Sequence, residues 1–276
     1  MHEPAEKTGL RNAWDRVADV YVDLWATRTA HISAQGLDLL APAAGSYALD
    51  VACGPGLTTV ALADRIDGGS VVGLDFAPRM VARAEARFGG HGGVSFAVDD
   101  AERLDREPGS ADVLACHFGL MYCYDARAAM ASAARTLRPG GHMLQVVWGR
   151  APAVWWVPVI ALIETRAEYF SAVCPMMFFY GLPGVMPRMV GEAGLELAEL
   201  VTLEARMSFP GVDAAVDTAI HGGPLAGLFS HRLGPEAQEE VRTAMRAHVE
   251  GIAEPGPDGG ITLPAEAVLA VATRPG

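Results

Sequence analysis

A glycine-rich turn and three acidic residues follow one another in the first half of the chain. The segment from Asp50 to Gly56 (DVACGPG) lies between an apolar run and a stretch of helical spacing. Asp75 comes nineteen positions after Gly56, and Asp100 ends a third apolar run. Glycine lets a ligand approach the backbone closely. An acidic residue at this spacing suits ribose hydroxyls, and a further carboxylate can accept a hydrogen bond from an exocyclic amine. The pattern predicts a site for a ligand with a nucleoside part.

Each of these features also has a purely structural interpretation. The glycines could form a tight turn that binds nothing, and each aspartate could cap a helix or a turn. Three signals at the ends of three successive strands favour a ligand. A dinucleotide fingerprint would need glycine where the chain has Thr59, and a P-loop would need a lysine. The acidic Asp50 suits an ammonium or sulfonium group better than a pyrophosphate.

The charge balance argues against several classes of function. The 276 residues include 21 basic and 33 acidic side chains, a net charge of −12, so no nucleic-acid partner is expected. The one lysine, Lys7, falls within residues 1–12, which we expect to form a loose tail. Schiff-base chemistry, pyridoxal-phosphate chemistry and lysine-dependent phosphate binding are therefore disfavoured.

The four cysteines form no C-x-x-C pair, and the N-terminal residues lack the apolar segment of a signal peptide. We therefore expect a reduced, cytoplasmic protein. Cys116, His117 and Cys123 are close in sequence but lack the pair spacing of a zinc site, so no metal is predicted. The longest apolar run, 151–163, contains two prolines and is shorter than the roughly 20 residues of a membrane helix. No membrane partner is expected.

Strands and helices alternate across residues 47–148. Short apolar runs predict buried strands, and the segments between them have helical spacing. Strands are expected at 47–52, 71–75, 94–98, 112–116 and 142–148, and helices at 57–66, 78–88 and 126–137. This alternation predicts a doubly wound, parallel sheet with helices on both faces. Residues 12–40 have the spacing of one or two amphipathic helices that precede the sheet.

After residue 148 the alternation stops. Residues 150–190 are rich in Trp, Met, Phe and Pro, which predicts a helical lid over the site that could also pair with a second subunit in a homodimer. A helix at 187–193, a long strand at 195–207, a helical insert at about 213–250 and a last strand within 261–273 follow. The chain thus divides into an N-terminal helical segment (1–45), a cofactor-binding core (46–149), the lid (150–190) and the remainder of the sheet (191–276).

The segment LDVACGPGLTTVALA, which begins at Leu49, resembles motif I of the class I S-adenosylmethionine-dependent methyltransferases. Four further segments resemble later motifs of that family, in chain order GLDFAPRM, VDDAERLD, ADVLACHFGLMY and LRPGGHMLQVVW. The resemblance is strongest to the branch of the ubiquinone and menaquinone C-methyltransferases, and it covers residues 12–150 and the later strands. It implies an α/β fold with a doubly wound, mainly parallel, seven-stranded sheet.

The resemblance implies S-adenosylmethionine as the cofactor and S-adenosylhomocysteine as its product. The methionine part would lie over residues 52–56, where Ala52 replaces the glycine of many members. Asp75 would bind the ribose, and Tyr21 would close over the cofactor unless it is an ordinary core aromatic of its helix. The residues that the resemblance assigns to the cofactor are Tyr21, Ala52, Cys53, Gly54, Gly56, Asp75, Phe76, Met80, Asp100, Ala101, Cys116 and His117.

Methyl transfer needs a positioned acceptor and, for some acceptors, a base. His117 follows the fourth predicted strand and is the first candidate for a general base. In the alternative, its ring packs sideways and only its backbone meets the cofactor. The apolar lid predicts that the acceptor contacts Trp148, Trp155, Phe179 and His221, although such residues more often serve packing.

Two functions from different classes remain open from the sequence. The first is transfer of a methyl group to oxygen, nitrogen or carbon of a small, fairly apolar acceptor, in bacterial secondary metabolism. The second is a protein of the same fold that binds the cofactor without transferring a methyl group, such as a cyclase or a binding protein. A nicotinamide dehydrogenase is disfavoured, because the Tyr-x-x-x-Lys pair of the short-chain type is missing.

Overall fold

The computed structural model describes residues 4–169 and 174–276. In this part of the chain, eight strands form one sheet in the order β3-β2-β1-β4-β5-β8-β6, and the short β7 pairs with β8. The strands are β1 (Tyr47–Val51), β2 (Ser70–Asp75), β3 (Val94–Val98), β4 (Ala111–His117), β5 (Leu137–Trp148), β6 (Glu196–Phe209), β7 (Glu254–Pro255) and β8 (Ile261–Thr273).

The first five strands are parallel, and β8 runs antiparallel between β5 and β6. Leu269 of β8 pairs with Val146 of β5 on one side and with Val201 of β6 on the other. The prediction of a doubly wound, mainly parallel sheet is confirmed, and the two-residue β7 adds to the seven strands expected. Because the carboxyl ends of β1, β2 and β3 share one edge of the sheet, the loops after them meet there.

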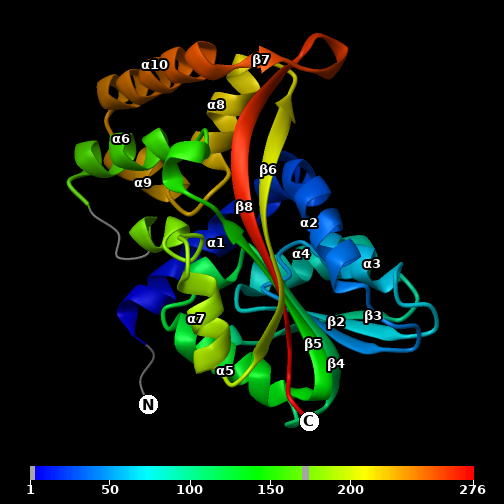
Figure 1. The fold of residues 1–276 in the computed structure, drawn as a ribbon. Helices are drawn as coiled ribbons and strands as arrows, with labels where there is room; N and C mark the ends of the chain where they lie inside the picture. The colour runs from blue at the N-terminus through cyan, green and yellow to red at the C-terminus, as the bar shows by residue number, and fades with distance from the viewer. Residues whose placement is uncertain (1–3, 170–173) are drawn as a thin grey trace.

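Helices cover both faces of the sheet (Figure 1). One face carries α2 (Thr27–Leu40) and α3 (Leu57–Ala63), and the other carries α5 (Ala126–Thr136) and α7 (Val185–Glu192). The helix α4 (Pro78–Phe88) packs on β2 and β3 and starts with a proline in its first turn, as the sequence predicts. The side chains between these layers form the main core of the protein.

The prediction of a loose tail over residues 1–12 is wrong from Ala5 onward. The helix α1 (Ala5–Tyr21) begins there and continues through a π-helical segment, η1 (Val22–Ala26), into α2. Apolar residues are sparse before Trp14, so the local sequence pattern does not indicate this part of the helix. In the structure Trp14 and Val17 pack on Ala77 and Met80, beside the start of α4, and this contact orders the helix. Residues 1–3 lie outside the described residues.

The lid and the later insert together form a helical cap at one end of the sheet (Figure 1). The cap consists of α6 (Val157–Ala167), α8 (Val212–His221), α9 (Ala226–Arg232) and α10 (Pro235–Ile252). The predicted lid also includes residues 170–173, which lie outside the described part of the chain. In that described part, none of the helices combines the length and apolar character needed to span a membrane.

Candidate functional site

The glycine turn after β1 adopts a conformation that most residues avoid. Ala52, Gly54 and Gly56 all have positive φ angles, of 58°, 54° and 85°. A Cβ on Gly54 would meet only the Tyr21 ring, at 3.9 Å, so the space beside this glycine is open. A Cβ on Gly56 would lie 2.8 Å from the ring of Phe96. Gly54 therefore leaves room for a ligand, whereas Gly56 is required for packing against β3.

Asp75 at the end of β2 ties this turn to the sheet. Its Oδ2 accepts a hydrogen bond from the Gly54 amide at 2.8 Å, and its Oδ1 accepts one from the Ala77 amide at 2.9 Å. Burial raises the pKa of this carboxyl to about 6, against the opposing effect of the amides. Each carboxylate oxygen can accept a further hydrogen bond, so Asp75 can also receive hydroxyl groups of a ligand.

Asp50, within β1, has one carboxylate oxygen without a partner among the described residues. Its Oδ2 accepts a hydrogen bond from the Thr59 hydroxyl at 2.6 Å, while its Oδ1 is buried and unpaired. Burial raises the pKa of Asp50 to about 7. Asp50, Cys53 and Gly54 line a hollow under the turn, the glycine-loop cavity. A cationic or hydrogen-bond-donating group in this cavity would satisfy the unpaired oxygen.

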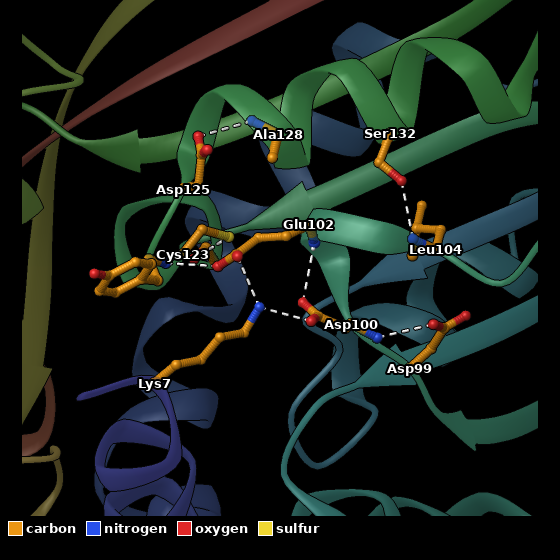
Figure 2. A network of polar contacts seen from close by, with 11 residues as sticks. Lys7, Asp99, Asp100, Glu102, Leu104, Cys123, Asp125, Ala128 and Ser132 are labelled. Atoms are coloured by element: carbon orange, nitrogen blue, oxygen red, sulfur yellow. Dashed lines mark hydrogen bonds and ion pairs between the residues drawn. The ribbon is translucent and has the colours of Figure 1, made fainter. Parts of the chain in front are cut away.

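Lys7 on α1 binds two carboxylates of the loop after β3 (Figure 2). Its Nζ lies 2.6 Å from Asp100 Oδ2 and 2.7 Å from Glu102 Oε2. Asp100 Oδ1 also accepts a hydrogen bond from the Glu102 amide at 3.1 Å. Burial lowers the pKa of Lys7, but its hydrogen bonds to both carboxylates outweigh this effect and the pKa is raised. The lysine expected in a loose tail is therefore buried and helps to close the site.

The side chains at the ends of β2 and β3 enclose a cavity of about 680 Å³, including the part that is open to solvent. We call it the carboxylate cavity, because Asp75, Asp99, Asp100 and Glu102 line it together with Lys7. Ten of the twelve residues assigned to the cofactor line this cavity or the adjoining glycine-loop cavity, namely Tyr21, Ala52, Cys53, Gly54, Asp75, Phe76, Met80, Asp100, Ala101 and His117. Gly56 and Cys116 line neither of the two, because both are used in packing.

His117, at the end of β4, lines both cavities. Its ring lies against α2, where its Cε1 would be 3.5 Å from a Cβ on Gly36. Both ring nitrogens are buried without a partner among the described residues. Burial lowers the pKa of His117 to about 3, with a further contribution from the charge of Arg65. The imidazole is therefore neutral at pH 7, and its role as a general base stays a prediction.

A second hollow, of about 580 Å³ including its open part, adjoins the carboxylate cavity. We call it the tryptophan chamber, because Trp14, Trp25, Trp148 and Trp156 line it. It shares four wall residues with the carboxylate cavity, namely Trp14, Tyr21, Phe118 and Tyr122. A molecule in the chamber would thus be separated from the carboxylate cavity only by a collar of aromatic rings.

Of the four residues predicted to bind the acceptor, the structure brings only Trp148 to this chamber. Trp155 stacks on Trp25 from the core side, with a centroid distance of 6.2 Å. Phe179 lines a separate surface hollow. The Nε2 of His221 lies 2.8 Å from an Arg242 nitrogen, and its ring contacts Phe229. These positions depend on how the cap helices pack, which residue type alone does not reveal.

Sequence reasoning missed several residues of the site. Lys7 and Trp14 precede Tyr21 at intervals of seven residues, so all three lie on one face of α1. That spacing is the signal that could have placed Lys7 at the site with Tyr21. Phe118, by contrast, lines both the carboxylate cavity and the tryptophan chamber. Its backbone has a positive φ of 56°, and no pattern in the sequence predicts this conformation.

Comparison with known proteins identifies the family. Residues 48–141 match the profile of the methyltransferase domain family. The ubiquinone biosynthesis O-methyltransferase of Pseudomonas aeruginosa is 31% identical over 174 residues, which are 60% of this chain and 72% of that protein. The demethylmenaquinone methyltransferase of Beutenbergia cavernae is 36% identical over 134 residues, which span about half of each chain (49% and 52%).

A solved structure from Bacillus halodurans C-125, assigned provisionally as a methyltransferase, shares the fold. It has a TM-score of 0.62 and 19% identity, covering 88% of this chain and 99% of that one. Together with the glycine turn and the strand-end carboxylates, these matches place the protein in its family. The chain belongs to the class I S-adenosylmethionine-dependent methyltransferases.

Proposed function

We propose that this protein transfers a methyl group from S-adenosylmethionine to oxygen, nitrogen or carbon of a small, fairly apolar acceptor. The observation that carries the proposal is the arrangement of Asp50 in β1, Asp75 at the end of β2 and Asp100 in the loop after β3 around an open glycine turn. Family membership and the neighbouring tryptophan chamber support it. We extend the proposal to a cytoplasmic enzyme of bacterial secondary metabolism.

The residues of the two cavities fit this cofactor. The unpaired Asp50 oxygen would accept a hydrogen bond from the ammonium group of the methionine part, directly or through water. Asp75 would bind the ribose hydroxyls, and Asp100 would bind the adenine amine. When bound, S-adenosylmethionine supplies a methyl group on a positively charged sulfur, which an acceptor atom displaces with release of S-adenosylhomocysteine. The protein then contributes mainly position and exclusion of water.

Calorimetric titration with S-adenosylmethionine, S-adenosylhomocysteine and NAD tests the cofactor. We expect micromolar binding of the first two, about −8 kcal/mol, and no binding of NAD. Asp75→Ala should weaken binding by about 1–3 kcal/mol, because it removes a buried hydrogen-bond partner. Asp67→Ala, at an exposed position between α3 and β2, is the matched control and should bind normally.

Release of S-adenosylhomocysteine in the presence of candidate acceptors then tests transfer. Cofactor binding without turnover on any acceptor would favour the alternative, a cofactor-binding protein or cyclase of the same fold. Absence of cofactor binding in well-folded protein would contradict the proposal itself.

A further inference from the structure

The tryptophan chamber differs sharply in charge from the cavity beside it. Sixteen described residues line the chamber, and none of them is Asp, Glu, Lys, Arg or His. The carboxylate cavity, only one layer of aromatic rings away, is lined by Lys7 and four carboxylates. An anionic group in the chamber would lose its hydration without gaining a counter-ion, which costs several kcal/mol. The lining therefore disfavours an anionic occupant.

The rings of the chamber hold one another in place. Trp156 packs edge-on against Trp25 at 5.5 Å and against Trp148 at 5.9 Å. Phe118 stacks on Trp148 with a centroid distance of 4.2 Å and an interplanar angle of 29°. Seven of the sixteen lining residues are aromatic, so the walls present rigid ring faces and edges. Such walls suit a flat aromatic molecule, which can stack without deforming them.

Two side chains of the chamber wall, those of Trp156 and Tyr21, can donate hydrogen bonds. The indole Nε1 of Trp156 is buried without a partner among the described residues. Burial raises the pKa of Tyr21 well above its usual value, so its phenol stays protonated and can donate. Thr29 already uses its hydroxyl proton near the carbonyls of Trp25 and Ala26, both at 3.3 Å. A carbonyl or hydroxyl oxygen on the occupant would satisfy these donors.

We propose that the tryptophan chamber binds the methyl acceptor, and that this acceptor is a flat aromatic molecule that carries a carbonyl or hydroxyl oxygen and no anionic group. The identity of this molecule as the acceptor rests on the proposed methyl transfer, but its binding can be measured alone. Molecules with a carboxylate or a phosphate on the buried ring system are excluded from the chamber.

A matched pair of probes tests the selectivity of the chamber. We would titrate 2-naphthol and 6-hydroxy-2-naphthoate into the protein by calorimetry, with and without S-adenosylhomocysteine. The neutral naphthol should bind at least tenfold more tightly than the carboxylate. Trp156→Phe, which keeps a smaller aromatic ring and removes the N–H group, should weaken naphthol binding severalfold.

Two glycine substitutions test the location. Gly223 lines the chamber, and a Cβ added there meets no atom within 4 Å, so Gly223→Leu should fill the space without strain. It should weaken naphthol binding at least tenfold and leave S-adenosylhomocysteine affinity unchanged. Gly191→Leu, an equally open position on the exposed face of α7, is the control and should change neither affinity.

Three results would overturn the inference: equal or tighter binding of the naphthoate, no binding of naphthol, or unchanged naphthol binding in Gly223→Leu. A wrong proposed function would give a different result. Binding of S-adenosylhomocysteine or turnover would then be absent, while naphthol binding would persist.

Discussion

The buried environment of Asp50 disfavours the charged form of its carboxyl. Its carboxyl is buried, and its pKa is raised from 3.8 to about 7. Between these two values the folded protein binds a proton that the unfolded chain has lost, so the free energy of unfolding falls as the pH rises through this window. Above pH 7 the penalty is complete, and a shift of this size corresponds to about 4 kcal/mol at most. A buried carboxylate of this kind lowers the free energy of unfolding of the ligand-free protein, but it is positioned to bind a cationic ligand.

Asp50→Asn should therefore stabilise the ligand-free protein and weaken its site. We expect a gain of about 1–4 kcal/mol in the free energy of unfolding at pH 8, which vanishes towards pH 4. Affinity for S-adenosylhomocysteine should fall about tenfold or more, because a hydrogen bond between charged groups is lost. Thermal unfolding from pH 4 to 8 and calorimetry measure the two effects.

Asp67→Asn, a change of the same type at an exposed position, is the control and should alter neither quantity. Loss of stability at pH 8 in Asp50→Asn, or unchanged affinity, would contradict the role assigned to Asp50.

At the scale of elements, a buried ion-paired cluster and an apolar contact help to hold α1 against the sheet. The side chains of Lys7 and Glu102 are only 11% and 13% exposed, so their interaction is much less screened than a surface pair. Trp14 and Val17 supply the apolar contact with the start of α4. Because Lys7 binds the carboxylate that is expected to meet the adenine amine, we expect the position of α1 and cofactor binding to be coupled.

Lys7→Met, which keeps most of the length of the side chain and removes its charge, should loosen α1 over the carboxylate cavity. Two neighbouring carboxylates would be left without their cation, which we expect to reduce stability by about 1–3 kcal/mol. Dissociation of S-adenosylhomocysteine should become severalfold faster, as measured by stopped-flow displacement. Arg79→Met breaks an exposed pair with Asp19 between α4 and α1 and should change stability by less than about 1 kcal/mol.

Replacing Glu102 by Gln in the Lys7→Met background removes one of the two unpaired charges and should restore part of the lost stability. An unchanged dissociation rate in Lys7→Met would show that α1 does not control access to the cavity.

At the scale of the whole molecule, the site lies where three parts of the chain meet. The strand ends supply the carboxylates, α1 supplies Lys7, Trp14 and Tyr21, and the helical cap with its flanking loops supplies Trp156 and residues 222–225 (Figure 1). A homodimer through residues 150–190 stays a prediction. Binding at such a junction should stabilise the entire fold, since the unfolded chain contains no site.

S-adenosylhomocysteine at about 100 times its dissociation constant should raise the free energy of unfolding by about 2.7 kcal/mol. For a chain of this size this corresponds to a rise of roughly 5–10 °C in the unfolding midpoint. Differential scanning calorimetry over a series of concentrations measures the shift, and NAD at the same concentrations should produce none. A shift of equal size with NAD would show that the stabilisation is not specific to this cofactor.

Local patterns were sufficient to predict the sheet, and most of the residues assigned to the cofactor line the two cavities at its strand ends. The βαβ alternation determined the parallel strands, because strand and helix periodicity are properties of short segments. The glycine turn, Asp75 and Asp100 could be found because the carboxyl ends of adjacent parallel strands necessarily share one edge of the sheet. The types and spacing of these residues were therefore enough to predict that they lie close together.

The tertiary structure decided what depends on packing between distant segments. It placed Lys7 against Asp100, 93 residues away, and it used Gly56 for packing rather than for the ligand. It also brought Trp25 and Trp156 together in one chamber while it turned Trp155, Phe179 and His221 away from it. Contacts of this kind follow from how the cap helices pack on the sheet. No local spacing in the sequence encodes that packing, since each helix face is selected by the neighbour that covers it.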